Sequence, residues 1–142
     1  MELPIITILD GMDNMDFQRV TDMLAKASWC PGISRKEVEQ GAANSALVVG
    51  AFFAGAQIGY SRVISDKTRF AYLSDVYVNE AYRGHGIGPM MVEYILAHES
   101  LKDVYQWALY TTNAQHIYAH VGFKPLEKPE CWMQIRSDRP NR

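Results

Sequence analysis

The chain has 142 residues, of which 48% are hydrophobic, and this size suits one compact domain spanning residues 1–142. Its formal charge of −2 and pI near 6.1 give no overall attraction to nucleic acid or anionic lipid, so neither is expected as a partner. The longest apolar runs, such as residues 46–54, are too short to span a bilayer, and no basic secretion signal opens the chain. We therefore expect a soluble cytoplasmic protein.

Two cysteines, Cys30 and Cys131, stand far apart and outside any metal-ligand spacing. This pattern disfavours a disulfide framework or a zinc cluster and favours two reduced thiols.

The first 45 residues predict one strand and two helices. Residues 5–9 are short and β-branched, as in a strand. Apolar residues then recur at spacings of three and four, which predicts a helix over residues 13–28. Ser34, followed three residues later by Glu37, resembles a capping box and opens a second helix that runs toward Asn44.

The rest of the chain predicts a mixed α/β domain. Residues 46–53 and 56–64 should form a hairpin, and residues 70–78 a third strand. A glycine loop, a helix and a strand over residues 104–110 follow. This crossover should make the strands over residues 70–78 and 104–110 parallel. Finally we expect a short helix over residues 114–120, ended by Gly122, and a last strand over residues 131–135.

The loop Arg83-Gly84-His85-Gly86-Ile87-Gly88-Pro89 precedes a helix. A helix start carries unpaired N–H groups and a partial positive charge, and glycines let an anion approach them. Arg83 adds a cation that suits phosphate. A plain strand-to-helix turn is the alternative. The dinucleotide fingerprint fails for want of its third glycine, and the P-loop fails for want of Gly-Lys-Ser/Thr.

Two motifs in register resemble the GNAT superfamily of N-acetyltransferases. Arg83 to Gly88 matches its Q/R-x-x-G-x-G/A motif, and Tyr118 to Phe123 resembles its Tyr-x-x-x-Gly-Phe signature. The resemblance implies a mostly antiparallel α/β sheet with a splayed parallel strand pair and flanking helices.

The resemblance also implies that acetyl-CoA is the co-substrate and that no metal is needed. Backbone amides of the loop would hold the pyrophosphate through residues Arg83, Gly84, His85, Gly86, Ile87, Gly88 and Pro89. The preceding strand would carry a bulge, splay from its parallel neighbour, and pair with the pantetheine arm through the backbone of Val76, Tyr77 and Val78.

Tyr118 matches the position of a tyrosine that donates a hydrogen bond or proton to the departing thiolate; packing alone is the alternative. Family members often have an asparagine seven residues earlier, where this chain has Thr111. Asn113 is therefore expected either to contact the cofactor or to cap the last helix.

The acceptor amine must lose a proton before it attacks, so a base is needed. Asp75 is the first candidate, ahead of Glu80 and His120, although a hydrogen-bonded structural carboxylate is equally compatible. Trp29 and Tyr60 would shape the acceptor pocket, or Trp29 would be simply structural. His116 and His120 have metal-ligand spacing but no third ligand nearby, so no metal site is expected.

These expectations favour acetyl transfer to a primary amine of a small molecule, because the chain leaves no room for an appended docking domain. Acetylation of a protein or peptide amine and a non-catalytic CoA-binding regulator are the alternatives. Exposed aromatics such as Trp132 also suggest a homodimer.

Overall fold

One five-stranded sheet runs through the protein in the order β1-β2-β3-β4-β5. The computed structural model describes residues 5–138. The strands are β1 (Thr7–Asp10), β2 (Leu47–Phe53), β3 (Ala56–Ser65), β4 (Phe70–Val78) and β5 (Gln106–Ala108). The helices are α1 (Phe17–Leu24), α2 (Arg35–Ala43), α3 (Ile87–Leu96) and α4 (Gln115–Ala119), with short 3₁₀ turns η1 (Met12–Asn14), η2 (Glu80–Tyr82), η3 (Glu99–Leu101) and η4 (Pro129–Cys131).

The sheet is antiparallel except at one edge. β1 through β4 pair antiparallel, and β4 pairs with β5 in parallel, as the crossover through α3 requires. The hairpin, the strand over residues 70–78 and the parallel pair are thereby confirmed.

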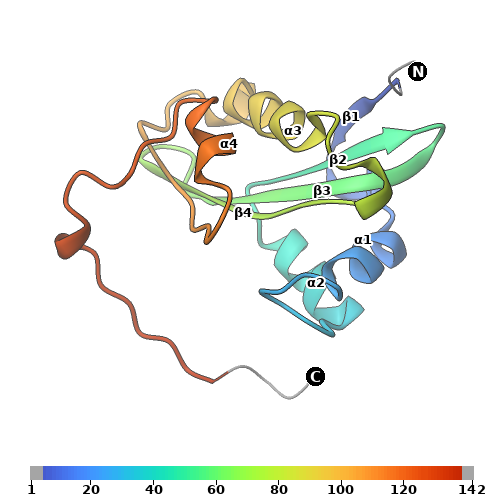
Figure 1. Cartoon of the computed structure of the whole chain (residues 1–142), viewed down its shortest axis with the longest axis horizontal. Coiled ribbons are helices and arrows are strands. Elements are labelled where there is room, and N and C mark those ends of the chain that lie inside the picture. The colour runs from blue at the N-terminus through green and yellow to red at the C-terminus, as the bar shows by residue number, and fades with distance from the viewer. Residues whose placement is uncertain (1–4, 139–142) are drawn as a thin grey trace.

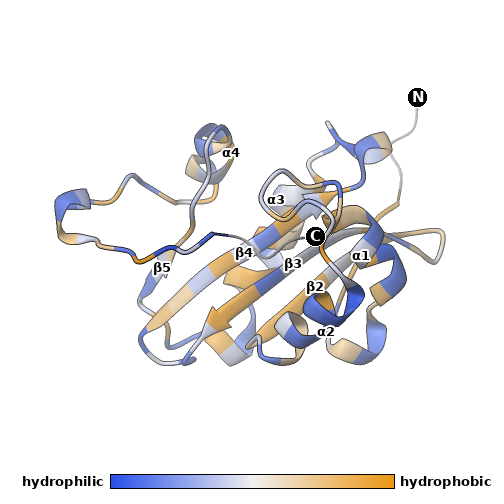
Figure 2. Cartoon of the chain, turned by 90° about the horizontal axis from the view of Figure 1, so that it is seen from below, coloured by the Kyte–Doolittle hydropathy of each residue, from blue (hydrophilic) through white to orange (hydrophobic). Residues whose placement is uncertain are grey.

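Helices cover both faces of the sheet, with α1 and α2 on one side and α3 and α4 on the other (Figure 1). The core is correspondingly divided. Val20, Leu24, Val38, Tyr60 and Tyr77 belong to the cluster under α1 and α2, whereas the cluster under α3 is built from aliphatic residues of the sheet and of α3 itself. Figure 2 shows hydrophobic colour along β2, β3 and β4 and hydrophilic colour on α2.

The helix starts follow their capping residues. The Ser34 hydroxyl accepts a hydrogen bond from the Glu37 N–H, which confirms the predicted start of α2. The first helix is shorter than the predicted 13–28, because Met15 is extended and Asp16 caps α1 by accepting from the Arg19 N–H. β5 is likewise shorter than the predicted 104–110.

β4 carries a bulge near its end. Tyr60 lies opposite Tyr77 and Arg62 opposite Ser74, so two residues of β4, Asp75 and Val76, face the single Ser61 of β3. Asp75 has φ of 56°. It is therefore the residue whose left-handed conformation accommodates the extra position.

β4 and β5 separate just before the bulge. β5 pairs only with residues 70–72 of β4, in the register Phe70 with Gln106, Ala71 with Trp107 and Tyr72 with Ala108. Past Tyr72, no strand of the described residues pairs with this edge of β4. The splayed parallel pair implied by the sequence motifs is therefore present.

The strand predicted over residues 131–135 is wrong. This segment begins with the end of η4 and continues extended, without pairing to any strand of residues 5–138. Its alternating apolar pattern is typical of a strand, but the segment runs away from the sheet (Figure 1).

Candidate functional site

Asp75 is the centre of a polar cluster at the bulge. Its Oδ1 accepts from the Trp29 indole N–H at 2.8 Å, and its Oδ2 accepts from the Arg62 Nε–H at 2.7 Å. Both members of the Arg62–Asp75 ion pair are largely shielded from solvent. The loop after α1 supplies Trp29, β3 supplies Arg62, and the bulge turns the Asp75 carboxylate toward both. The carboxylate is thereby held in one orientation.

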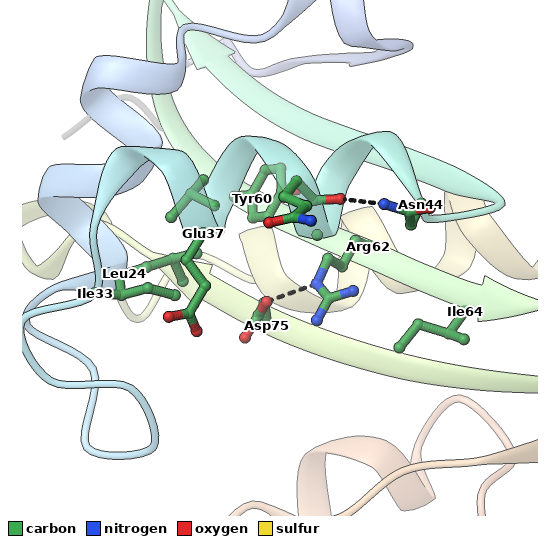
Figure 3. A pocket seen from close by; sticks show the side chains of 11 residues that line it. Leu24, Ile33, Glu37, Asn44, Tyr60, Arg62, Ile64 and Asp75 are labelled. Atoms are coloured by element: carbon green, nitrogen blue, oxygen red, sulfur yellow. Dashed lines mark hydrogen bonds and ion pairs between the residues drawn. The ribbon is translucent and has the colours of Figure 1, made fainter. Parts of the chain in front are cut away.

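A hollow of about 400 Å³ lies between α2 and the sheet next to this cluster. Figure 3 shows Glu37 reaching into it from α2, and Asp75 and Arg62 from the strands below. Leu24, Ile33 and Ile64 make part of its wall apolar. The hollow is therefore lined by one cation, two carboxylates and several apolar side chains, as is typical of a site for a small polar ligand.

Of the two residues predicted to shape the acceptor pocket, Tyr60 is among the residues lining this hollow. Trp29 instead lies beside it, half-exposed, with its ring edge-on to Tyr77 at 6.3 Å between centroids. The structure thus brings Trp29, Tyr60 and Asp75 to one region of the α2 face.

The Tyr60 side chain is buried, and its hydroxyl has no hydrogen-bond partner among the described residues. Burial raises the pKa of the phenol above its usual value, while the nearby Arg62 lowers it and Asp75 raises it. The hydroxyl therefore stays protonated at neutral pH.

The backbone at the end of β4 borders the gap where β4 and β5 separate, which we call the splay. Tyr77 packs its ring toward α1, whereas Val76 and Val78 pack on the α3 side. Arg83 holds the end of the strand, because its Nε–H donates to the Val78 carbonyl at 2.9 Å and its guanidinium lies 5.1 Å from the centre of the Tyr77 ring.

The glycine loop leads into α3 as the sequence predicts. Gly84 and Gly86 have φ of 86° and 75°, a conformation that favours glycine, and a Cβ built on either would meet nothing within 4 Å. Gly86 is the N-cap residue, and no side chain caps the helix there. The start of α3 is thus left without a side-chain cap, and an uncapped helix start of this kind can bind phosphate. Ile87 is buried, Gly88 lies near the Val78 side chain, and Pro89 falls in the first turn.

Tyr118 lies in α4, on the other side of the splay from the hollow. Its ring packs edge-on against Phe123, 6.0 Å between centroids, and against the α3-side cluster. Burial raises the pKa of its phenol. Tyr118 and Asp75 thus belong to different elements and different clusters, with the splayed strands between them.

Asn113 does not cap the last helix. The N-cap of α4 is Ala114, whose N–H donates to the Thr111 hydroxyl at 3.1 Å. Thr111, at the position where an asparagine is often found, has therefore taken over a local structural role. Asn113 itself is exposed, and a contact to the cofactor stays a prediction for it.

The weaker base candidates, Glu80 and His120, are both exposed, in η2 and at the end of α4. Within residues 5–138, no three His, Cys, Asp or Glu side chains gather as a metal site would require, and His116 and His120 are exposed. No helix in this part of the chain has the length and apolar character needed to cross a bilayer.

Sequence reasoning missed Arg62 and Glu37 as members of the site. Arg62 is the only charged residue of β3, and a single charge in a largely apolar strand of a hairpin is a signal that could have drawn attention to it. Glu37 was explained by its place in the capping box, and its position over the hollow follows only from how α2 packs on the sheet.

Comparison with known proteins bears on what this site does. Residues 44–125 match the model of the acetyltransferase (GNAT) domain. A solved structure from Xanthomonas campestris pv. campestris, assigned to the GNAT family, is 28% identical, with 96% of each chain covered and a TM-score of 0.89. A GNAT-family acetyltransferase from Streptococcus pneumoniae is 23% identical, covers 96% of this chain and all of its own, and has a TM-score of 0.75.

A third solved structure, an acetyltransferase from Clostridium acetobutylicum described with acetyl-CoA, is 15% identical. It covers 93% of this chain and 96% of its own, with a TM-score of 0.70, and so supports the fold alone. No curated protein matches the chain.

Proposed function

Because the chain belongs to the GNAT family of acetyltransferases, we propose that it moves an acetyl group from acetyl-CoA directly to a primary amine of a small-molecule acceptor. One observation carries the proposal. The splay between β4 and β5 separates the glycine loop and Tyr118 from a polar hollow that contains Asp75. A thioester lying in the splay would face an amine lying in the hollow.

The residues beside the splay suit acetyl-CoA. Among residues 5–138, no strand pairs with the edge of β4 beyond Tyr72, and an extended chain with amide groups can bind such an edge as a peptide does. The open N-terminus of α3, with Gly84 and Gly86, suits the pyrophosphate. Acetyl-CoA, when bound, supplies the activated acetyl group; the chain supplies the orientation.

The hollow supports a small acceptor over a protein. Its volume of about 400 Å³ falls in the range typical of small-molecule sites. The carboxylates of Glu37 and Asp75 outnumber the single guanidinium of Arg62 there, so the lining favours an acceptor that arrives as an ammonium cation. Asp75 can receive it on the lone pairs that Trp29 and Arg62 leave unused.

Asp75 and Tyr118 then act at the two ends of the reaction, Asp75 on the attacking amine and Tyr118 on the departing thiolate. The ammonium gives up a proton to Asp75, directly or through water, and its nitrogen becomes nucleophilic. On the other side of the splay, the Tyr118 phenol donates a hydrogen bond to the departing thiolate. Because burial raises its pKa, that phenol is protonated at neutral pH and suits donation better than complete proton transfer.

The reducing cytoplasm is the proposed place of this reaction. Cys30 and Cys131 are present as thiols and not as a disulfide, as is usual there. A cell fractionation that found the protein only in membranes would contradict this.

The decisive experiment is an acceptor screen. The protein, saturated with acetyl-CoA, is incubated with a panel of small primary amines and with peptides, and a mass increase of one acetyl group is recorded with the release of free thiol. We expect modification of small cationic amines. Modification of peptides alone would favour a protein acceptor, and tight acetyl-CoA binding without any turnover would favour a regulator.

Two variants then separate the roles. Tyr118→Phe and Asp75→Asn should each lower kcat about 10- to 1,000-fold while the Kd for acetyl-CoA changes less than about threefold, because neither side chain binds the phosphates. Tyr105→Phe, at an exposed site, is the matched control and should leave both values unchanged. Unchanged kcat in both test variants would remove their assigned roles.

A further inference from the structure

The cation of the hollow uses only part of its hydrogen-bonding capacity. A guanidinium has five N–H groups. Arg62 uses two of them, one at Nε that donates to the Asp75 carboxylate at 2.7 Å and one at Nη1 that donates to the Ser45 hydroxyl at 3.3 Å. The other three, one on Nη1 and two on Nη2, make no hydrogen bond within residues 5–138.

The Arg62 guanidinium is held in one position. It lies against α2, where a Cβ added to Gly41 would come within 3.6 Å of the guanidinium carbon. Ser45 is fixed in turn, because its hydroxyl donates to the Gly41 carbonyl at 2.7 Å. Asp75 holds the guanidinium from the side of β4, and the Arg62 side chain is only 20% exposed. The edge formed by Nη1 and Nη2 is therefore preorganised, and a ligand that binds it has little side-chain motion to arrest.

This edge matches a carboxylate. Two parallel N–H groups can bind both oxygens of one carboxylate, which is the geometry in which arginine binds this group best. Asp75 does not use the edge, because its two oxygens accept from different donors, Oδ2 from Arg62 and Oδ1 from Trp29. Since Arg62 lines the hollow, its Nη1–Nη2 edge is left for the carboxylate of a ligand there.

The charges around the hollow favour a ligand that carries both signs. Arg62 and Asp75 lie side by side in its wall, and Glu37 reaches in from α2 (Figure 3). A ligand with only an ammonium group would leave the Arg62 edge without an anion, whereas a ligand with only a carboxylate would meet two carboxylates. A zwitterion can pair each of its groups with a partner of opposite charge.

The partners of the two charges are neighbours. Arg62 Nε and Asp75 Oδ2 are 2.7 Å apart, so an anion on Arg62 and a cation on Asp75 also lie close together. In an α-amino acid the amine and the carboxylate are attached to one carbon, which gives this short separation. The N-terminus of a peptide and the side chain of a lysine have no carboxylate beside the amine, so neither can make both contacts.

The rest of the wall suits an apolar side chain. Leu24, Ile33, Val38 and Ile64 all line the hollow, and Ile64 is 44% exposed. An aliphatic side chain placed over Ile64 would remove apolar surface of both groups from water.

We propose that the acceptor is an α-amino acid with an apolar side chain. Its carboxylate binds the Nη1–Nη2 edge of Arg62, its amine lies on Asp75, and its side chain covers Ile64. This proposal rests on the proposed acetyl transfer and narrows its acceptor, since amines without a carboxylate bind the same site more weakly. Arg62 thereby selects the acceptor and leaves the amine at the base beside the splay.

The reaction with such an acceptor forms an amide bond at the α-nitrogen and breaks the C–S bond of the thioester. The ammonium nitrogen loses two protons. One leaves through Asp75, and the other ends on the thiol of CoA.

A matched pair of acceptors tests the contact with the carboxylate. L-Leucine and 3-methylbutylamine differ only in that group. With acetyl-CoA saturating, kcat/KM for L-leucine should exceed kcat/KM for 3-methylbutylamine about 10- to 100-fold, the range of a hydrogen-bonded charge pair. Equal values, with both amines acetylated, would overturn the amino-acid acceptor and leave the proposed acetyl transfer intact.

The variant Arg62→Lys tests the guanidinium edge. Lysine keeps the positive charge beside Asp75 but lacks the two parallel N–H groups. The preference for L-leucine should fall to less than about threefold, whereas Arg69→Lys, at an exposed position outside the hollow, should keep the wild-type preference. A merely structural effect of Arg62→Lys would lower kcat/KM for both acceptors alike, and a preference due only to the lower basicity of the amino-acid amine would persist. A preference that persists in Arg62→Lys overturns the proposal.

Calorimetry distinguishes failure of this proposal from failure of the proposed function. With CoA bound in place of acetyl-CoA, L-leucine should bind about 10- to 100-fold more tightly than 3-methylbutylamine, and Arg62→Lys should remove the difference. L-Leucine that binds in this way without being acetylated would contradict the proposed function and support the ligand. Absence of L-leucine binding at millimolar concentrations would overturn the amino-acid site.

Discussion

Asp75 shows how one residue can organise a site. Its left-handed backbone inserts an extra position in β4, and this changes which face the following side chains point to. Ala71 and Leu73 pack toward α3 before the bulge, and Val76 and Val78 do so after it. Without the bulge, Tyr77 would share the side of Leu73; with it, Tyr77 packs toward α1.

The importance of Asp75 could be predicted, but its partners could not. A carboxylate in a strand next to the glycine loop indicates either chemistry or a partner, and the structure supplies two partners, Trp29 and Arg62. The family resemblance implied a bulge in this strand, but no glycine marks it, so the residue at which it falls could not be predicted. Which face it occupies therefore depended on a backbone feature that the residue types leave undetermined.

Tyr60 gives a residue-scale prediction about stability. Its buried hydroxyl has no hydrogen-bond partner in the described part of the chain, so Tyr60→Phe should raise the free energy of unfolding at pH 7 by about 1 kcal/mol, measured by urea denaturation. The pKa of Tyr60 is raised in the folded state, so its contribution to stability is complete below pH of about 10, where the unfolded phenol begins to ionise, and is lost as the pH rises further. The variant should therefore lose less stability than the wild type between pH 9 and 11.

Tyr110→Phe, at an exposed position, is the control for Tyr60→Phe and should change neither the stability nor its pH dependence. A loss of more than about 1 kcal/mol in Tyr60→Phe would mean that a bound water satisfies the hydroxyl in solution.

At the scale of elements, prediction succeeded where one local rule decides the outcome. The hairpin, β4 and the capped start of α2 follow from alternation, a Gly-containing turn and a capping side chain. The prediction of a strand over residues 131–135 failed because an alternating pattern shows only that a segment can pair, whereas pairing also needs a strand edge beside it. The predicted first helix was too long at its end because Ala27 continues the apolar spacing past Leu24, and too long at its start because Asp16 caps α1.

The loop before α3 allows a matched comparison of glycines. Gly84 and Gly55 have nearly the same φ, 86° and 84°, and a Cβ on either would meet nothing within 4 Å. Alanine at each position should therefore cost a similar free energy of unfolding, about 1 kcal/mol, through backbone strain alone. Because Gly84 also approaches the proposed pyrophosphate site, only Gly84→Ala should weaken acetyl-CoA binding, by about tenfold in calorimetry.

Gly55 lies in the turn between β2 and β3, away from the loop, so Gly55→Ala should keep the wild-type affinity. Equal affinities in the two variants would return the loop to the role of a simple turn.

At the scale of the whole molecule, the proposed site is divided between the two faces of the sheet. The α3 side carries the glycine loop and Tyr118, and the α2 side carries the hollow with Glu37, Arg62 and Asp75. Only the splay connects the two sides. This division could be anticipated for the α3 side, because its motifs are contiguous in sequence, and not for the α2 side, whose residues come from three separate elements.

Acetyl-CoA should therefore stabilise the whole fold, since its proposed site joins β4, α3 and the β5 wall. A ligand at 100 times its Kd adds about 2.7 kcal/mol to the free energy of unfolding. With an unfolding entropy of about 0.3 kcal/mol/K for a chain of 142 residues, this amounts to a rise in Tm of about 9 °C. CoA without the acetyl group should give nearly the same rise, because the phosphates and the pantetheine make the proposed contacts. In Gly84→Ala the same concentration would be about 10 times a Kd raised tenfold, and the rise should fall to about 5 °C. Scanning calorimetry at fixed protein concentration measures all three, and a rise below about 2 °C for the wild type at millimolar acetyl-CoA would contradict the site.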